Sequence, residues 1–161
     1  MNTISHAAAT KITPTIGSAF VDPDTIDWSP WVMEGTWFKL LNFDPKTGGF
    51  TMLLRVNPNN EAPIHGHIGD VEGWILKGGF SYEDDHGLAG YYVLERGGIN
   101  HMPSTGPDGM EMLAIAHSPL VGFNDDGSVG AVVDAKLMYT LAKDSGAANH
   151  LKPPEHWTDI A

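Results

Sequence analysis

Three histidines and one glutamate have the types and the spacing of a metal site. His65 and His67 stand two residues apart, Glu72 follows, and His101 lies further along the chain. Side chains at positions i and i+2 of a strand point to the same face, so one strand can offer both imidazoles to one ion. We therefore predict a metal site with His65, His67 and His101. Glu72 is either a fourth ligand or an acceptor that orients a histidine.

Strands and glycine turns are expected to position these side chains. Glu72 begins a short apolar run that ends at Gly78 and Gly79, and another β-rich run, residues 91–94, ends at two glycines just before His101. Glu72 is an odd number of residues from His67 and would face away on an unbroken strand. A turn at Gly69 and Asp70 is expected to bring it back.

The rest of the chain also reads mainly as strands. A hairpin is expected from residues 36–41 and 50–56, a loop over 102–109, and strands over 110–117 and 119–123. The exception is a helix over residues 135–145, with Asp134 as its N-cap and Gly146 as its C-cap. We expect a flexible N-terminal arm (1–20), a single β-barrel domain that includes the helix (21–146) and a C-terminal tail (147–161).

Composition narrows the function classes. The chain has 161 residues, 42% of them hydrophobic, with 19 Gly and 11 Pro, which favours one turn-rich domain. A formal charge of −11 disfavours nucleic acid and membrane partners. No segment has the roughly 20 apolar residues of a membrane span, and residues 1–20 lack the apolar core of a secretory signal, so a cytoplasmic location is expected. With 0 Cys, any metal is held by histidine and carboxylate.

The same residues resemble a known family. His65-x-His67, four residues, Glu72, six residues and Gly79 are similar to the first cupin motif, and Gly90, Gly98 and His101 are similar to the second. The departures are Asn59 for an opening Gly, Arg96 for a Pro and Thr105 for an Asn. None of these three positions is a metal ligand in the motifs. The resemblance implies an all-β fold, a single-domain cupin (small β-barrel or jelly roll) with a short C-terminal helix.

The chain resembles one branch of the cupin family more closely than the others. Residues 34–41, 47–51 and 119–127 resemble acetylacetone-cleaving and 2,4'-dihydroxyacetophenone dioxygenases. That resemblance implies a non-haem iron(II) dioxygenase that uses O₂ to cleave a carbon–carbon bond in a small β-diketone or hydroxyketone. By motif position, the iron ligands are His65, His67 and His101.

The ligands alone leave alternatives. Three neutral imidazoles do not cancel the charge of a divalent ion, which favours an anionic chelating substrate such as an enolate; coordination by Glu72 would cancel one charge. Fe(II) is the favoured cofactor, with Zn, Ni or Mn as alternatives. The alternative functions are another metal-dependent cupin enzyme with three His plus Glu, or a non-catalytic cupin that binds a small molecule.

Other expectations concern the pocket and the partners. No catalytic residue is predicted beyond the metal ligands. The substrate pocket is predicted from aromatic, methionine and histidine side chains near the motifs. The expected partners are a small-molecule substrate, O₂ and further copies of the chain, as a homodimer or homotetramer. The predicted pocket residues are Trp37, Phe50, Met52, Trp74, Met102 and His117.

Overall fold

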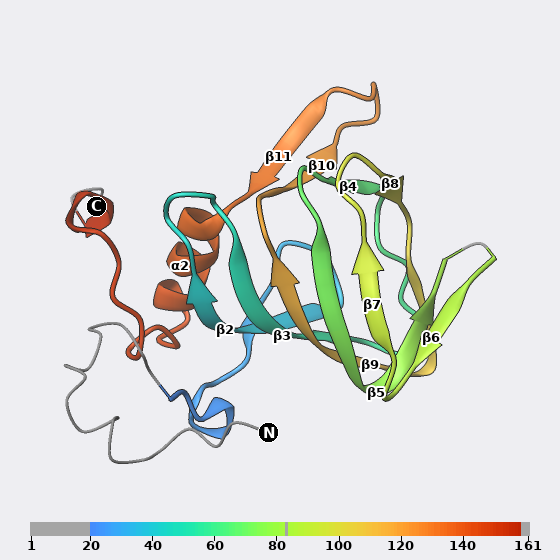
Figure 1. Ribbon diagram of the computed structural model, residues 1–161, viewed down its shortest axis with the longest axis horizontal. Coiled ribbons are helices and arrows are strands. Elements are labelled where there is room, and N and C mark those ends of the chain that lie inside the picture. Colours follow the sequence, from blue (N-terminus) through green and yellow to red (C-terminus); the bar gives the residue numbers. More distant parts are fainter. Residues whose placement is uncertain (1–19, 83, 159–161) are drawn as a thin grey trace, which may run out of the picture.

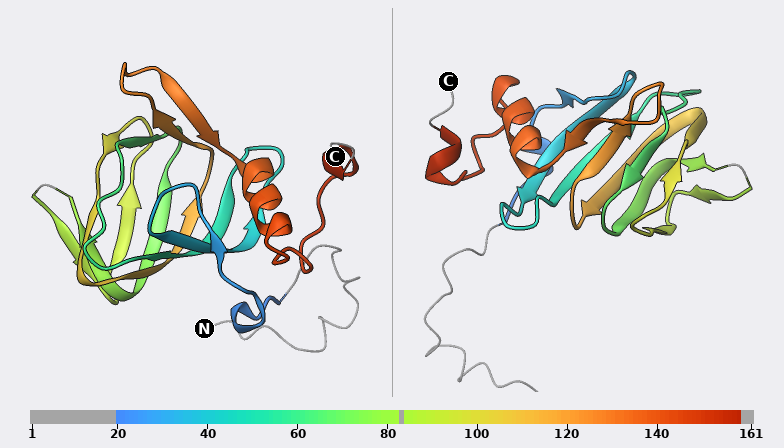
Figure 2. Two further views of the ribbon diagram at one scale, coloured as in Figure 1. Left: turned by 180° about the vertical axis from the view of Figure 1, so that it is seen from behind. Right: turned by 90° about the horizontal axis from the view of Figure 1, so that it is seen from above.

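Two antiparallel sheets and a helix form the molecule, seen in a computed structural model that describes residues 20–82 and 84–158 (Figures 1 and 2). The larger sheet has the strand order β1-β2-β3-β9-β5-β6, with β7 also pairing β5, and the smaller has the order β11-β10-β4-β8. The elements are η1 (Pro23–Thr25), β1 (Ser29–Pro30), β2 (Thr36–Phe43), β3 (Phe50–Val56), β4 (His65–His67), β5 (Val71–Ser81), β6 (His86–Leu88), β7 (Tyr92–Glu95), β8 (Asn100–His101), β9 (Ser104–Ala116), β10 (Leu120–Phe123), β11 (Val129–Val133), α2 (Ala135–Asp144) and α3 (Glu155–Thr158).

The predicted hairpin is confirmed. Strands β2 and β3 pair antiparallel from Thr36↔Val56 to Phe43↔Phe50. Its turn is fixed by Asp44, whose carboxylate accepts hydrogen bonds from the Lys46 backbone N–H (2.8 Å) and the Thr47 hydroxyl (3.0 Å). Alternate residues of β3 are buried, and Phe38 and Leu40 of β2 are buried opposite Leu54 and Met52, which gives this sheet an inner and an outer face.

The loop expected over residues 102–109 is a strand from Ser104 onward. Strand β5 runs to Ser81, and its last residues pair with β9 at Phe80↔Thr105 and Ser81↔Ser104. The register shift in β5 at Gly78/Phe80 accommodates the turn-type residues of β9, which lie between Thr105 and Met110. Long-range pairing therefore overrides the local turn signal there.

Helix α2 confirms the late helical prediction. The Asp134 side chain caps it by accepting a hydrogen bond from Leu137 N–H at 2.8 Å, and Gly146 follows its end with φ +73°. Met138 is fully buried against the sheet, and its sulfur accepts a 3.0 Å hydrogen bond from the Trp31 indole. The helix thus covers the β1–β2 end of the larger sheet.

The two terminal segments are only partly described. Residues 1–19 of the predicted arm lie outside the described residues. In the predicted tail, Ala147 and Ala148 are buried, and the His150 side chain contacts Leu40 O at 2.8 Å. Trp157 packs on Phe43 at 5.1 Å between ring centroids, so the described part of the tail contacts the barrel. No helix within 20–82 and 84–158 has the length and hydropathy that a membrane crossing requires.

Candidate metal centre

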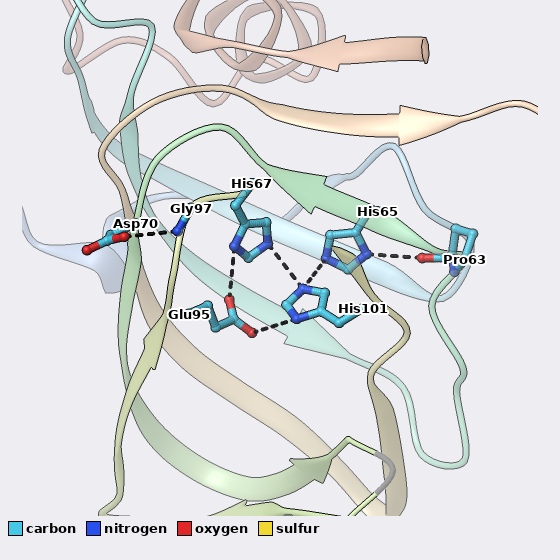
Figure 3. Close-up of polar contacts among 7 residues, drawn as sticks. All are labelled: Pro63, His65, His67, Asp70, Glu95, Gly97 and His101. Atoms are coloured by element: carbon cyan, nitrogen blue, oxygen red, sulfur yellow. Dashed lines mark hydrogen bonds and ion pairs between the residues drawn. The ribbon is translucent and has the colours of Figure 1, made fainter. Parts of the chain in front are cut away.

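The imidazoles of His65, His67 and His101 meet at one point between the two sheets (Figure 3). His101 Nε2 lies 3.0 Å from His65 Nε2 and 3.2 Å from His67 Nε2. The ligand atoms of the three residues all lie within 4.8 Å of one another. Of the described residues, these three form the one such group of potential metal ligands.

Strand pairing produces this convergence. His65 and His67 lie on the same face of β4, and β8 pairs antiparallel with β4 so that His101 stands opposite His65. The connection back to β8 passes through Gly98, whose φ of +81° suits glycine and whose N–H donates to His67 O at 2.7 Å. Gly66, between the two ligands on β4, has no room for a side chain because Asn100 and Val121 occupy that space.

Backbone and carboxylate groups orient the rings. A carbonyl oxygen only accepts, so the 3.0 Å contact from His65 Nδ1 to Pro63 O places a proton on Nδ1. In the neutral ring, Nε2 then turns a lone pair toward the cluster. The Glu95 carboxylate lies 3.7 Å from His67 Nδ1 and 3.8 Å from His101 Nδ1, which favours the same tautomer in both rings (Figure 3).

Burial keeps the three imidazoles neutral. Desolvation, reinforced by the neighbouring histidines, lowers the pKa of His67 to about 3, and desolvation with the nearby His65 lowers the pKa of His101 to about 4. Burial also lowers the pKa of His65. At neutral pH the cluster therefore offers unprotonated nitrogens.

Glu95 is the site residue that the sequence prediction missed. It lies at the end of β7, pairs with Val71 and points inward, with its side chain only 12% exposed. Burial raises the pKa of its carboxyl group to about 7. The signal that could have found it is strand parity: Val93 and Glu95 share one face of β7, and Val93 packs on the core.

Glu72 does not join the cluster, which corrects the expectation of a fourth ligand. Its carboxylate lies on the outer face of β5, where it accepts a 2.6 Å hydrogen bond from the Tyr92 hydroxyl and lies 2.7 Å from His117 Nε2. Both partners lower the pKa of Glu72, with the Tyr92 hydrogen bond as the larger cause. Val71, one residue earlier, faces the core, and the bend at Ile68 and Gly69 does not turn Glu72 inward.

Two of the six residues predicted for the substrate pocket line an inner cavity, and the other four do not. An inner cavity of about 80 Å³ lies beside the cluster, lined by His65, His67, Glu95 and mainly apolar side chains that include Phe50 and Met52. Trp74 and His117 are exposed on the outer face of the larger sheet, and Trp37 and Met102 line surface hollows instead. Sequence proximity to the motifs does not reveal which face of a strand a residue occupies.

Methionines and aromatic rings complete the surroundings of the cluster. Met33, Met110 and Met112 line the inner cavity together with Met52, and the described lining residues include no Lys or Arg. On the other side, the Tyr82 ring stacks on His101 at 4.9 Å between centroids with a 17° interplanar angle. Tyr82 therefore helps to fix the plane of that imidazole.

The donor set fits a divalent transition metal. Three lone pairs that face one another at these distances repel unless a proton or a cation lies between them, and the low histidine pKa values disfavour protons. Neutral imidazoles are ligands of iron, zinc, nickel and manganese. His67 Nδ1 is buried without a hydrogen-bond partner, and only the Glu95 carboxylate approaches it.

Comparisons with known proteins agree with this architecture. The family model of the ChrR cupin-like domain matches residues 17–121. An RmlC-like cupin protein from Ralstonia eutropha JMP134 superimposes with a TM-score of 0.76 at 22% identity, covering 87% of this chain and 94% of its own. No curated protein matches the sequence.

Two further solved structures are linked by name to acetylacetone cleavage. A protein from Methylibium petroleiphilum PM1, for which acetylacetone dioxygenase activity is suggested, gives a TM-score of 0.71 at 24% identity and covers 80% of this chain and 96% of its own. An acetylacetone dioxygenase from Acinetobacter johnsonii gives 0.64 at 19% identity, with 94% and 100% covered. At these identities the likeness establishes the fold.

Proposed function

Because the chain belongs to the ChrR cupin-like family, we propose that it is a metal-dependent cupin enzyme, and specifically an iron(II) dioxygenase that cleaves a carbon–carbon bond in a small β-diketone or hydroxyketone. The observation that carries the proposal is the convergence of three neutral imidazoles beside an apolar cavity. His65, His67 and His101 would hold the ion. When bound, it would supply two positive charges and open positions for a chelating substrate and O₂.

The cavity supports a small and mostly apolar substrate. Its described lining contains no cationic side chain, so a phosphate or carboxylate group would find no partner there except the ion. The methionine side chains adapt to irregular apolar shapes. An enolate satisfies both requirements, because its two oxygens can chelate the ion while its alkyl or aryl groups contact the apolar wall.

Glu95 has the position of a proton acceptor in this chemistry. It lines the same cavity as His67, and a carboxylate in that position can accept a proton from a substrate in the cavity. Its carboxylate also lies beside the Nδ1 atoms of His67 and His101 and so holds both rings with Nε2 toward the ion. Its negative charge partly offsets the charge of a bound cation.

The test is oxygen uptake by iron(II)-reconstituted protein across a panel of β-diketones and hydroxyacetophenones. We expect uptake that is lost in His101→Ala and retained in Glu72→Gln, since Glu72 lies outside the cluster. Absence of uptake from wild-type protein that holds one ion per chain would refute the dioxygenase proposal and favour a different reaction or a binding role. Loss of uptake in Glu72→Gln would refute the assignment of the site.

A further inference from the structure

The outer face of the larger sheet carries a row of apolar side chains. Cross-strand pairing sets Leu53 of β3 beside Leu113 of β9, Leu113 beside Trp74 of β5, and Trp74 beside Tyr92 of β7. Trp74 is 50% exposed and Tyr92 54% exposed. We call these four residues the apolar row; it crosses the strands that lie side by side in Figure 1.

Described parts of the chain cover only one end of this face. Trp28 lies on the outer side of β2 and β3, 3.9 Å from the Arg55 guanidinium and 4.9 Å from Lys39 Nζ, measured to its ring centroid. Helix α2 does not cover this face, because it packs on β1 and β2 with Met138 and Ala142 in the core. Among residues 20–82 and 84–158, no element packs over the part of the row formed by Trp74 and Tyr92.

Two charged rows of opposite sign flank the apolar row. On one side Arg55, Glu111 and Lys77 are paired in register, with 2.8 Å from Arg55 Nη2 and 3.0 Å from Lys77 Nζ to the Glu111 carboxylate oxygens. On the other side Glu72 pairs in register with Ile115 and Leu94. The first row has a formal charge of +1 and Glu72 contributes −1, so the face as a whole is neutral.

A neutral apolar face is unusual for a chain of charge −11 and suits a second copy of the same chain. Two such chains repel through most of their surface, so their close approach requires a face without net charge. The four strands, at about 4.8 Å spacing and seven residues of about 3.4 Å, give a projected face of about 450 Å². That is more than half of the roughly 800 Å² that each partner contributes to a standard interface.

We propose that this face binds the same face of a second copy, with a two-fold axis that runs along the apolar row. Rotation about that axis keeps Trp74 of one copy near Trp74 of the other and exchanges the two flanking rows. Lys77 of each copy then lies over Glu72 of its partner copy. The contact is isologous, with an aromatic centre and a polar rim, as in other stable dimers.

Sedimentation equilibrium of the full chain tests the proposal. Wild-type protein is expected to be dimeric, and Trp74→Glu is expected to raise the dissociation constant at least about 100-fold, the scale of losing a central aromatic contact. Val129→Glu is the control, because Val129 is an apolar residue exposed to a similar fraction (58%) on β11, away from this face. Thermal unfolding of each variant verifies that the monomer is folded.

Exchanging the charges of Lys77 and Glu72 tests the proposed position of the two-fold axis. Lys77→Glu and Glu72→Lys are each expected to weaken the dimer about tenfold, and the double variant is expected to restore it, since each new pair is again opposite in sign. Lys77 and Glu72 lie on the same strand opposite residues four apart on β9, which is about 14 Å, so restoration cannot arise within one chain. A monomeric wild-type chain, a Trp74→Glu dimer of unchanged strength, or a double variant as weak as the singles would overturn the proposal. If the chain is monomeric and iodide does not quench the fluorescence of Trp74, this result would also overturn the proposal. Residues 1–19, and not a second copy, would then be the candidate for covering Trp74.

Discussion

Replacing Glu95 by Gln should stabilise the metal-free protein at high pH and leave it unchanged at low pH. Burial raises the pKa of Glu95 from 4.5 to about 7. Between these two values the folded protein holds a proton that the unfolded chain has released, so the free energy of unfolding falls as the pH rises. This decrease in the free energy of unfolding is complete above about pH 7 and absent below about pH 4.5.

The size of the effect follows from the same two values. The interval from 4.5 to about 7, at about 1.36 kcal/mol per pKa unit, corresponds to about 3 kcal/mol. Gln carries no charge to desolvate, so Glu95→Gln should recover that amount at pH 8, which is about 6–12 °C in melting temperature for a chain of this size. At pH 4.5 the gain should be below about 0.5 kcal/mol, the scale of a neutral surface change.

Urea unfolding of chelator-treated wild type and variant at pH 4.5 and pH 8 measures this difference. The histidines titrate alike in both proteins, so their contributions cancel at each pH. Glu34→Gln, a change at an exposed glutamate, is the control and should alter stability equally at both pH values. Equal effects of Glu95→Gln at both pH values would refute the reasoning and would mean that Glu95 is held ionised by a protonated His67 or His101.

The negative charge of Glu95, which is unfavourable in the metal-free protein, should become favourable when metal is bound. A cation between the imidazoles favours the ionised carboxylate, so Glu95→Gln should weaken metal binding about 10- to 100-fold, the usual range for a group that orients ligands. Calorimetric titration with a divalent ion measures this directly. A variant that is both more stable without metal and weaker in binding it would separate the two roles of the carboxylate.

Three further predictions concern the metal. Single replacements of His65, His67 or His101 by Ala should abolish binding of one divalent ion per chain, measured by elemental analysis, whereas Glu72→Gln and the exposed His86→Ala should retain it. Because the pKa values of His67 and His101 lie at about 3 and about 4, the affinity of the Glu95→Gln variant, which has no carboxyl group to protonate, should hold from pH 8 to about pH 5 and fall below it as protons compete; a tenfold loss between pH 8 and pH 6 in that variant would contradict this. A divalent ion at about 1,000 times its dissociation constant should add about 4 kcal/mol of stability and raise the melting temperature by about 8–16 °C, reversed by chelator; an unchanged melting temperature would contradict a site specific to the folded state.

Local signals in the sequence predicted much of the fold. The parity of His65 and His67, the turn at Asp44 and the Asp134 cap each depend on residues close in the chain, and each is found as expected. The cupin motifs added His101, which local patterns alone would not have joined to the pair.

Features that depend on distant pairing could not be predicted in this way. Glu72 and Glu95 stand on neighbouring strands. Parity places Glu95 on the same face as Val93, but the register Val71↔Glu95 is what shows that this face is the inner one. The start of β9 at Ser104 depends in the same way on the length of β5. Trp74 appeared to be a pocket residue because no local signal distinguishes the inner from the outer face of a strand.

The brevity of β4 and β8 has a consequence for the site. These strands, three and two residues long, share the pairs His65↔His101 and Gly66↔Asn100, whereas β5 and β9 are joined over most of their length. An ion held by His65, His67 and His101 would therefore act as a cross-link where the sheet itself is weakest. Amide hydrogen exchange would report binding of the ion: the backbone N–H of His67, which donates to Ile99 O, should exchange early in the metal-free barrel and more slowly when the ion is bound.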